Sequence, residues 1–315
     1  MISIIIPILN EAENLPRLIS HLSAKTSDNS NLSEVILVDG GSIDGTQSIA
    51  QRLSKNYPYL NLTLVSSAKG RAKLLVKDEG LIAGVEFAQM VFTYVEPSME
   101  FEVLIPDGNI VKHGDVAFHV YGSSQGILKG ERLVLNAMQR MSAIATKTNH
   151  FVKILEGTKT KILDTRKTTP GIRALEKWAV KIGGGENHRF ALYDMVMLKD
   201  NHIDFAGGIP EAIEKTKDYL DNNNLDLKII VEARDLEEVE LILSAGGVYR
   251  ILLDNFSLEQ TRIAVDLIGN NCLTESSGGI NEETIRGYAD CGVDYISSGA
   301  LTHSVYNMDL SLKAM

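Results

Sequence analysis

The segment from Asp164 to His202 carries a high density of groups that bind anions. It contains seven lysines and arginines against five carboxylates, within a chain whose formal net charge is −10. Its histidines, His188 and His202, add donors that can gain charge near neutral pH. A basic cluster in an acidic protein indicates a focused site for a small polyanion. Nucleic-acid binding would instead predict a basic face or a high pI, and the pI is about 5.3.

Composition bounds the class of protein. The 315 residues are 44% hydrophobic and 23% charged, which is ordinary for a globular chain of one large or two smaller domains. The opening ISIIIPIL is too short to span a bilayer and lacks the features of a signal peptide. Only Cys272 and Cys291 are present, which gives no disulfide framework and no thiolate metal cluster. We therefore expect a reduced, cytoplasmic setting and no membrane partner.

The elements that must position these charges recur in the last half of the chain. Short apolar runs that end in a polar residue alternate with amphipathic helical patterns, which predicts parallel strands with right-handed crossovers. The predicted strands are residues 161–165, 195–200, 228–232, 249–254, 272–276 and 294–298. An α/β barrel is the simplest closure of such a set.

The carboxyl ends of these strands carry a mixed set of charges. In α/β barrels the chemistry lies at those ends. The residues expected there are Arg166, Lys167, Lys199, Glu232, Asp254, Glu275 and Ser297. The last two strands run into glycine-rich turns, residues 276–280 and 297–301, whose backbone N–H groups suit a terminal phosphate.

The upstream regions have a different texture. Residues 74–87, 99–111 and 115–128 contain strand-like runs with turns between them, which predicts a smaller, sheet-rich domain. A helix-like segment, residues 130–155, then leads into the barrel. The first 70 residues instead read as strand, helix start and a second strand that ends in an Asp-rich and Gly-rich loop, a βαβ opening of a nucleotide-binding kind.

From about Lys73 onward the chain resembles the quinolinate phosphoribosyltransferase family, also called carboxylating nicotinate-nucleotide pyrophosphorylases. The matching phrases, in family order, are ERLVLNAMQRMSAIAT, DTRKTTPGIRALEKWAVKIGGGENHR, LKDNHI, VEARD, LLDN, ESSGGI and ISSGALTHS. The resemblance implies a small α/β sandwich domain, residues 73–125 together with the C-terminal tail, beside a six-stranded α/β barrel, residues 126–300. It also implies a homodimer or a higher assembly of dimers.

The resemblance further implies a set of site residues. Quinolinate, a dicarboxylate, would be bound by Arg166, His188, Arg189, Lys199 and, from the partner subunit, Arg132. Lys167, Glu232 and Asp254 would be the catalytic groups, the first serving quinolinate or pyrophosphate and the two carboxylates holding ribose hydroxyls and Mg²⁺ directly or through water. The 5′-phosphate would bind at Ser277, Gly278, Gly279, Ser298 and Gly299.

The implied reaction joins quinolinate to phosphoribosyl pyrophosphate in de novo NAD biosynthesis, and its enzyme is a glycosyltransferase of the pentosyl class. Its products are nicotinate mononucleotide, pyrophosphate and CO₂. Carboxylates can stabilise the positive charge that develops on the ribose, while Mg²⁺ and lysine neutralise the departing pyrophosphate. No Cys, Ser or metal-hydroxide nucleophile is required.

Residues 1–72 resemble the start of a family 2 glycosyltransferase of the A-type fold, through IPILNEAENL, VDGGSIDGT and SSAKGRAK. In that family Asn10, Glu11 and Asp39 would contact the nucleotide of a sugar donor. No DxD metal motif occurs after Ala72, and the acceptor half is missing, so we do not expect sugar transfer. A fused gene is the preferred account of the junction at Ala72 and Lys73.

Several alternatives stay open at this point. A nucleotide-sugar glycosyltransferase is the first alternative function, and a catalytically impaired fusion that cannot dimerise is the second. Arg173, Lys177 and Lys181 lie on a helical pattern and could bind the anion or form a solvated face. His202 could act in catalysis or form a local hydrogen bond.

Overall fold

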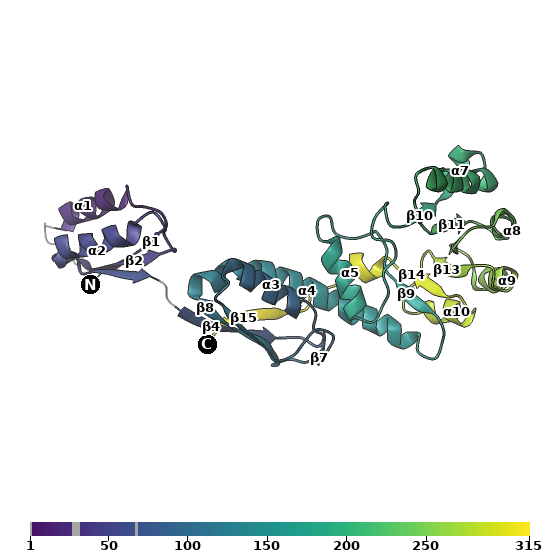
Figure 1. The fold of residues 1–315 in the computed structure, drawn as a ribbon. Helices are drawn as coiled ribbons and strands as arrows, with labels where there is room; N and C mark the ends of the chain where they lie inside the picture. Colours follow the sequence, from purple (N-terminus) through teal and green to yellow (C-terminus); the bar gives the residue numbers. More distant parts are fainter. Residues whose placement is uncertain (1, 27–31, 67–68) are drawn as a thin grey trace.

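The computed structural model describes residues 2–26, 32–66 and 69–315. Three parts follow one another along an elongated molecule: an N-terminal unit, a small domain with an antiparallel sheet, and a larger domain with a parallel sheet (Figure 1). The C-terminus returns to the small domain. No helix among the described residues is long and apolar enough to cross a membrane.

The N-terminal unit is a three-stranded parallel sheet with helices on one face. The strands β1 (Ile2–Ile8), β2 (Leu32–Asp39) and β3 (Leu62–Ser66) pair in the order β1-β2-β3. The helices are α1 (Leu15–Thr26) and α2 (Thr46–Asn56), and a short helix η1 (Pro58–Leu60) precedes β3. The unit has its own apolar core, so the expected βαβ opening is confirmed and extended by one more helix and strand.

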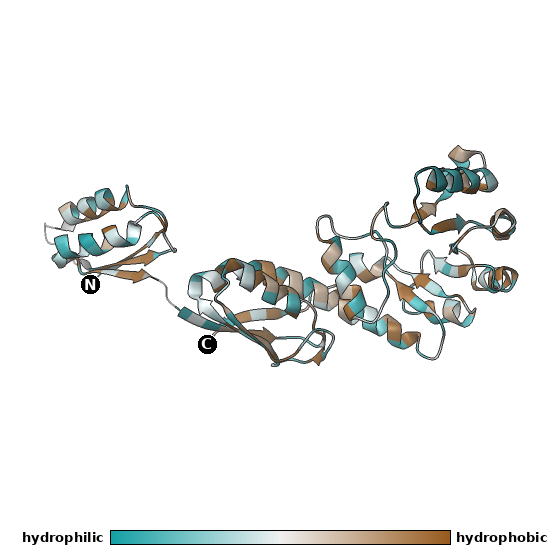
Figure 2. Ribbon diagram, in the orientation of Figure 1, coloured by the Kyte–Doolittle hydropathy of each residue, from teal (hydrophilic) through white to brown (hydrophobic). Residues whose placement is uncertain are grey.

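The other face of this sheet is uncovered. Alternate residues of a strand point to opposite faces. Val35 and Leu37 are buried under the helices, whereas Ile5 is 66% exposed and Val38 and Val65 are 36% and 37% exposed on the opposite face. Figure 2 shows these strands as largely apolar.

The small domain is an antiparallel sheet of order β15-β4-β8-β6. Its strands are β4 (Lys69–Val76), β6 (Glu100–Val103), β8 (Val116–Ser123) and β15 (Leu310–Ala314). A second pair, β5 (Gly80–Leu81) with β7 (Ile110–Val111), lies beside it. Because β15 pairs with β4 from Leu310 opposite Val76, the C-terminal tail is part of this sheet.

Two stretches expected to be strand-like are helical. Helix α3 (Val85–Val95) begins inside the run 74–87, and α4 (Ser124–Ile154) begins inside the run 115–128. The valine and aromatic content of α3 favours a strand by composition. Its buried residues, Val85, Ala88, Val91 and Phe92, instead follow helical spacing, and they pack against the small sheet.

Helix α4 joins the two larger domains. Its first residues are held by the Ser123 hydroxyl, which accepts a hydrogen bond from the N–H of Gly126 at 3.0 Å. Its amino-terminal half packs against the small-domain core through Val134, Leu135 and Met138. Its second half contributes Ile144 and Phe151 to the core of the parallel-sheet domain.

The larger domain repeats strand and helix as predicted. The six parallel strands are β9 (Lys161–Leu163), β10 (Val196–Leu198), β11 (Ile229–Ala233), β12 (Arg250–Asp254), β13 (Leu273–Ser277) and β14 (Tyr295–Ser297). Between and after them lie α5 (Arg173–Ile182), α6 (Asp200–Ala206), α7 (Ile209–Asn222), α8 (Leu236–Ala245), α9 (Leu258–Ile268), α10 (Ile285–Asp290) and α11 (Ala300–His303).

The pairing order is β10-β11-β12-β13-β14-β9. Among the described residues no ladder joins β9 to β10, so the hydrogen bonds leave one side of the expected barrel open. The α/β class with a parallel sheet is confirmed, whereas full closure into a barrel is not observed. Parallel order nevertheless brings all six carboxyl ends to the same edge.

Candidate active site

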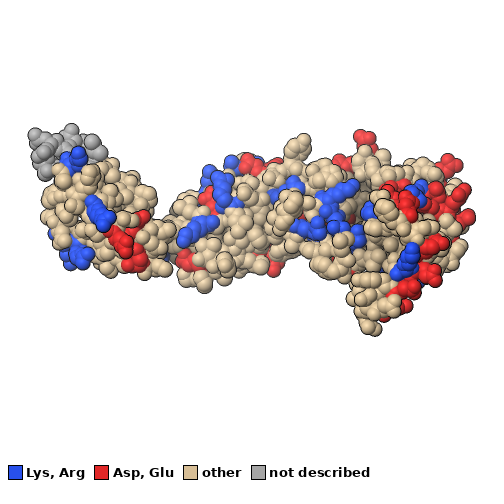
Figure 3. Space-filling model, turned by 90° about the horizontal axis from the view of Figure 1, so that it is seen from above, with Lys and Arg blue, Asp and Glu red and all other residues tan. Residues whose placement is uncertain are grey.

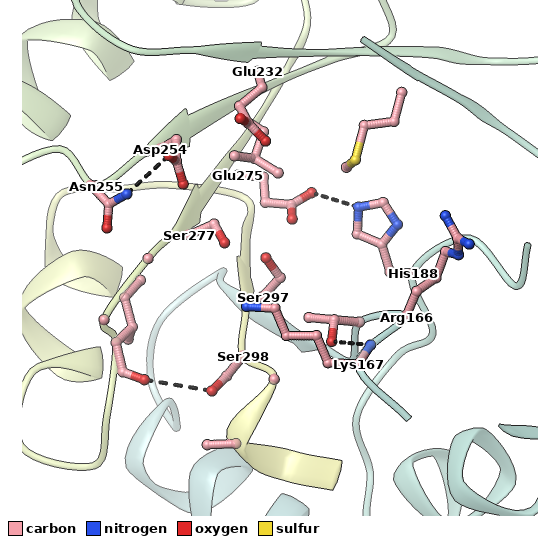
Figure 4. A pocket seen from close by; sticks show the side chains of 18 of the residues that line it. Arg166, Lys167, His188, Glu232, Asp254, Asn255, Glu275, Ser277, Ser297 and Ser298 are labelled. Carbon is pink, nitrogen blue, oxygen red and sulfur yellow. Dashed lines mark hydrogen bonds and ion pairs between the residues drawn. The ribbon is translucent and has the colours of Figure 1, made fainter. Parts of the chain in front are cut away.

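A pocket of about 630 Å³ lies at the carboxyl ends of the parallel strands (Figure 4). Every strand of the sheet contributes residues to it, either from the strand itself or from the loop that follows. The lining residues are Thr165, Arg166, Lys167, His188, Arg189, Met197, Lys199, Glu232, Leu252, Asp254, Asn255, Glu275, Ser277, Gly278, Gly279, Ile280, Ser297, Ser298, Gly299, Ala300 and His303. Of the site residues that the phosphoribosyltransferase resemblance implied, all are present there except Arg132, whereas Asn10, Glu11 and Asp39, implied by the glycosyltransferase resemblance, lie in the N-terminal unit.

One side of the pocket is cationic. Arg166 and Lys167 follow β9, Arg189 lies in the loop between α5 and β10, and Lys199 follows β10. Arg189 is only 8% exposed. Burial, reinforced by the nearby charge of Arg166, lowers the pKa of Arg189 from its usual value, which marks a place where an anion would be favoured. In Figure 3 lysines and arginines gather toward the middle of the molecule and acidic residues at the end farthest from the N-terminal unit.

The opposite side carries two carboxylates on neighbouring strands. Glu232 on β11 is 7% exposed, and its Oε2 accepts a hydrogen bond from Lys199 Nζ at 2.8 Å. Asp254 at the end of β12 accepts one from Asn255 Nδ2 at 2.9 Å. Among the described residues no group of three metal-ligating side chains occurs. Two carboxylates suit a Mg²⁺ ion that keeps waters and takes its other ligands from substrate phosphates.

The remaining wall consists of turns. Gly278 and Gly279 follow β13 with φ of 98° and 62°, a region that favours glycine. A Cβ atom on Gly278 would collide with the Asn255 side chain. Ser298 lies at the end of β14, where its N–H donates to the carbonyl of Leu163 at 3.0 Å. These turns place hydroxyl groups and backbone at the end of the pocket where a phosphate was expected.

Arg173, Lys177 and Lys181, whose role the sequence left undecided, do not line the pocket. Lys177 is buried, and its Nζ donates to Asp164 Oδ1 at 2.5 Å and to the His188 carbonyl at 3.0 Å. Arg173 donates to Thr168 Oγ1 at 3.0 Å and to the Phe190 carbonyl at 3.1 Å, and Lys181 is exposed. Lys177 and Arg173 thus brace the loops that carry the site.

His202 and Arg132 also lie away from the pocket. His202 Nδ1 accepts a hydrogen bond from the N–H of Lys199 at 3.0 Å, which favours the local structural interpretation over catalysis. Arg132 lies on an exposed stretch of α4 beside Leu133, which is 55% exposed. The structure of one chain therefore does not bring Arg132 to the other site residues.

Several residues in and behind the pocket were not predicted as site residues. Glu275 and Asn255 line the pocket, and Arg250 lies behind Glu275. The position of Glu275 near the end of a predicted strand indicates that it lies at the pocket mouth, but no sequence motif predicts a ligand for it. For Arg250 the available signal was strand alternation, since it shares a sheet face with Leu252 and Asp254 of the same strand.

A parallel sheet that gathers cations, two carboxylates and glycine-rich turns around one pocket at its carboxyl edge is typical of α/β enzymes that act on small anionic substrates. Comparison with known proteins identifies its group. Residues 144–313 match the C-terminal domain of quinolinate phosphoribosyl transferase, and residues 58–142 match its N-terminal domain. The chain therefore belongs to the quinolinate phosphoribosyl transferase family. Residues 3–77 match glycosyl transferase family 2, which overlaps the N-terminal match.

Relatives and solved structures agree with that placement. The chloroplastic nicotinate-nucleotide pyrophosphorylase of Oryza sativa subsp. japonica is 43% identical over 265 residues, which span 80% of this chain and 71% of that protein. A probable nicotinate-nucleotide pyrophosphorylase of Bacillus subtilis is 40% identical over 76% of this chain and 82% of its own length. NadC from Streptococcus pyogenes superposes with a TM-score of 0.74 at 38% identity, covering 80% of this chain and 89% of that one.

Proposed function

We propose that the chain transfers the phosphoribosyl group of phosphoribosyl pyrophosphate to quinolinate, forming nicotinate mononucleotide, pyrophosphate and CO₂ for NAD biosynthesis. The observation that carries the proposal is the convergence of Arg166, Arg189 and Lys199 with Glu232 and Asp254 on one pocket. A dicarboxylate needs several fixed cations, and a ribosyl cation needs carboxylates. Family membership supports the same reaction.

The cationic side would bind quinolinate. Arginine forks can pair with a carboxylate through two parallel hydrogen bonds, so Arg166 and Arg189 suit the two carboxylates of the ring. Lys167, beside Arg166, is placed to neutralise either quinolinate or the departing pyrophosphate. In the absence of substrate Lys199 pairs with Glu232, and we expect it to release that carboxylate when an anion enters.

The carboxylate side would bind the ribose and the metal. Glu232 and Asp254 would hold ribose hydroxyls and Mg²⁺, which neutralises charge on the pyrophosphate when bound. As the bond from ribose C1 to pyrophosphate breaks, the two carboxylates stabilise the positive charge on the sugar while the quinolinate nitrogen bonds to C1. The pyridinium ring then accepts the electron pair of the bond to the 2-carboxylate, CO₂ leaves, and a proton from solvent takes its place.

We further propose that the active protein is a dimer or an assembly of dimers in which Arg132 completes the site of the partner subunit. Arg132 lies outside the pocket of its own chain and near exposed apolar residues of α4, Leu128 and Leu133. The two cysteines are both free, and burial raises the pKa of each thiol. A reducing compartment such as the cytoplasm suits such thiols.

The reaction is tested by turnover of quinolinate with phosphoribosyl pyrophosphate and Mg²⁺, followed by chromatography of nicotinate mononucleotide. The shared site is tested by mixing Arg132→Ala with Arg166→Ala protein after dissociation and reassociation. If Arg132 acts across a twofold interface, half of the dimers are mixed and each has one intact site, so about a quarter of wild-type activity returns. A folded chain that forms no product refutes the reaction, and a mixture that stays inactive refutes the shared site.

A further inference from the structure

The floor of the pocket holds a carboxylate that the proposed reaction leaves without a role. Glu275 lies in the middle of β13 and its exposed fraction is 0%. Its Oε2 accepts a hydrogen bond from Arg250 Nη1 at 2.7 Å, and its Oε1 has no hydrogen-bond partner in the described part of the chain. Burial by itself raises the pKa of Glu275, but the contact with His188 and the charge of Arg250 outweigh it and hold that pKa below its usual value. The side chain is therefore a carboxylate.

Arg250 is the buried cation that pairs with Glu275. It is the first residue of β12 and is 4% exposed, so its charge is enclosed at the amino-terminal end of the sheet. Its guanidinium lies over the rings of Tyr295 and Tyr249, at 4.5 and 5.6 Å from their centroids. Arg250 is absent from the pocket lining, so it reaches the pocket only through Glu275.

His188 connects Glu275 to the substrate side. Its ring Nδ1 accepts a hydrogen bond from the backbone N–H of Arg189 at 2.7 Å. A backbone N–H can only donate, so Nδ1 carries no proton and the ring proton lies on Nε2. Nε2 lies 3.3 Å from Glu275 Oε2 (Figure 4), a close charge contact without hydrogen-bond geometry, and Nε2 has no hydrogen-bond partner among the described residues.

We propose that Arg250, Glu275 and His188 are positioning residues that hold the His188 ring as its neutral Nε2–H tautomer and thereby fix the main chain of Arg189 in the dicarboxylate subsite. The inference rests on the proposed function for the identity of that subsite. His188 then contributes orientation to the site, and the positive charge comes from arginine and lysine. Asp164 supports the same loop from the other side, because its Oδ1 accepts the N–H of His188 at 2.8 Å.

The test uses the full-length chain and three variants. Arg250→Met/Glu275→Leu replaces the buried ion pair by apolar side chains of similar size, a change that folded proteins often tolerate. Glu275→Gln keeps an acceptor oxygen for Nε2. Asp294→Asn is the matched control, because Asp294 bonds to Thr274, the neighbour of Glu275 on β13, but is not in the pocket lining.

We expect the double variant to raise the KM for quinolinate about thirtyfold, as loss of a group behind a ligand commonly does, with the KM for phosphoribosyl pyrophosphate within about twofold. Glu275→Gln should raise the quinolinate KM by less than about threefold, and the control should change neither. An unchanged quinolinate KM in the double variant, or equal rises in both KM values, refutes the proposal.

A second measurement is independent of activity and of the folding of the Arg250 and Glu275 variants. Long-range ¹H–¹⁵N spectra of the wild-type chain, with His188 assigned by His188→Asn, report which ring nitrogen carries the proton. A neutral Nε2–H pattern for His188 supports the proposed positioning role of Arg250, Glu275 and His188. A doubly protonated ring or an Nδ1–H pattern overturns it. Because this measurement needs no substrate, failure of the proposed positioning role is distinguishable from failure of the proposed reaction.

Discussion

The N-terminal unit and the parallel-sheet domain both place charged and glycine-rich loops after parallel strands, yet their loops differ in how the charges are paired. In the N-terminal unit Asp39 accepts hydrogen bonds from Ser42 and Gln47, and Asp44 accepts them from Ala12 and Thr46. Both carboxylates are occupied by partners within the unit that hold its two loops in place.

In the parallel-sheet domain the pairing is incomplete. Arg166 and Lys167 form no side-chain ion pair among the described residues, and the pocket gathers their charge with that of Arg189. Unpaired charges beside a cavity are available to bind a ligand, whereas charges that already have hydrogen-bond partners stabilise the loop. The pairing of charges therefore distinguishes a binding site from a structural loop of similar composition. Substitutions in the pocket and in the N-terminal unit test this distinction.

The largest effect should come from removing a pocket cation. Arg166→Ala deletes a charged donor aimed at the substrate, and truncating one partner of such a pair costs about 4 kcal/mol, so we expect about a thousandfold loss of kcat/KM with an unchanged melting midpoint. Lys181→Ala, an exposed lysine of α5 outside the pocket, is the control and should keep full activity. Steady-state kinetics and thermal denaturation measure both. Undiminished turnover by the Arg166 variant would contradict the site.

Removal of the metal should separate activity from folding. Two carboxylates alone bind Mg²⁺ weakly without phosphate oxygens, so a chelator should abolish turnover while leaving the melting midpoint within about 1 °C. Asp254→Asn should raise the Mg²⁺ concentration for half-maximal rate by about tenfold, because one anionic ligand is lost. Titration of rate against Mg²⁺ measures this. Turnover that persists in the chelator would exclude the proposed metal.

The sequence predicted the parallel strands and their strand-end residues, because apolar runs and the polar residue after each run are local features. Glu232 and Asp254, for instance, are predicted because each is the polar residue at the end of an apolar run, near the carboxyl ends of β11 and β12. Helix α3 was missed because its valine and aromatic content favours a strand while its buried spacing is helical. The Arg250 and Glu275 pair was missed because it joins neighbouring strands inside the sheet, and which buried charges meet depends on strand register.

The comparison also predicts that the N-terminal unit is dispensable for chemistry. None of its described residues lines the pocket, and Gln125 of α4 donates a hydrogen bond to its Asp39 carbonyl. A chain that begins at residue 67 should keep kcat/KM within about threefold, since substrate contacts are unchanged. The matched full-length protein is assayed in parallel. A loss above tenfold with an unchanged oligomeric state would assign the unit a part in catalysis.

The smallest effect on turnover should come from the N-terminal loop. Asp39→Asn replaces a buried carboxylate that accepts hydrogen bonds from Ser42 and Gln47, which should cost about 1–3 kcal/mol of the unit's stability and leave kcat/KM unchanged. Burial raises the pKa of Asp39, but its hydrogen bonds outweigh that effect and lower the pKa below the usual aspartate value.

The direction of that pKa fixes the pH dependence. A lowered pKa in the folded unit means that the contribution of Asp39 is fully present above the aspartate pKa of the unfolded chain and is lost as pH falls through the lower, folded value. Acid should therefore unfold the wild-type unit with a steeper pH dependence than the Asp39→Asn unit. Hydrogen exchange of residues 2–66 as a function of pH distinguishes the two. Equal pH dependence in both proteins would mean that Asp39 does not stabilise its loop as a carboxylate.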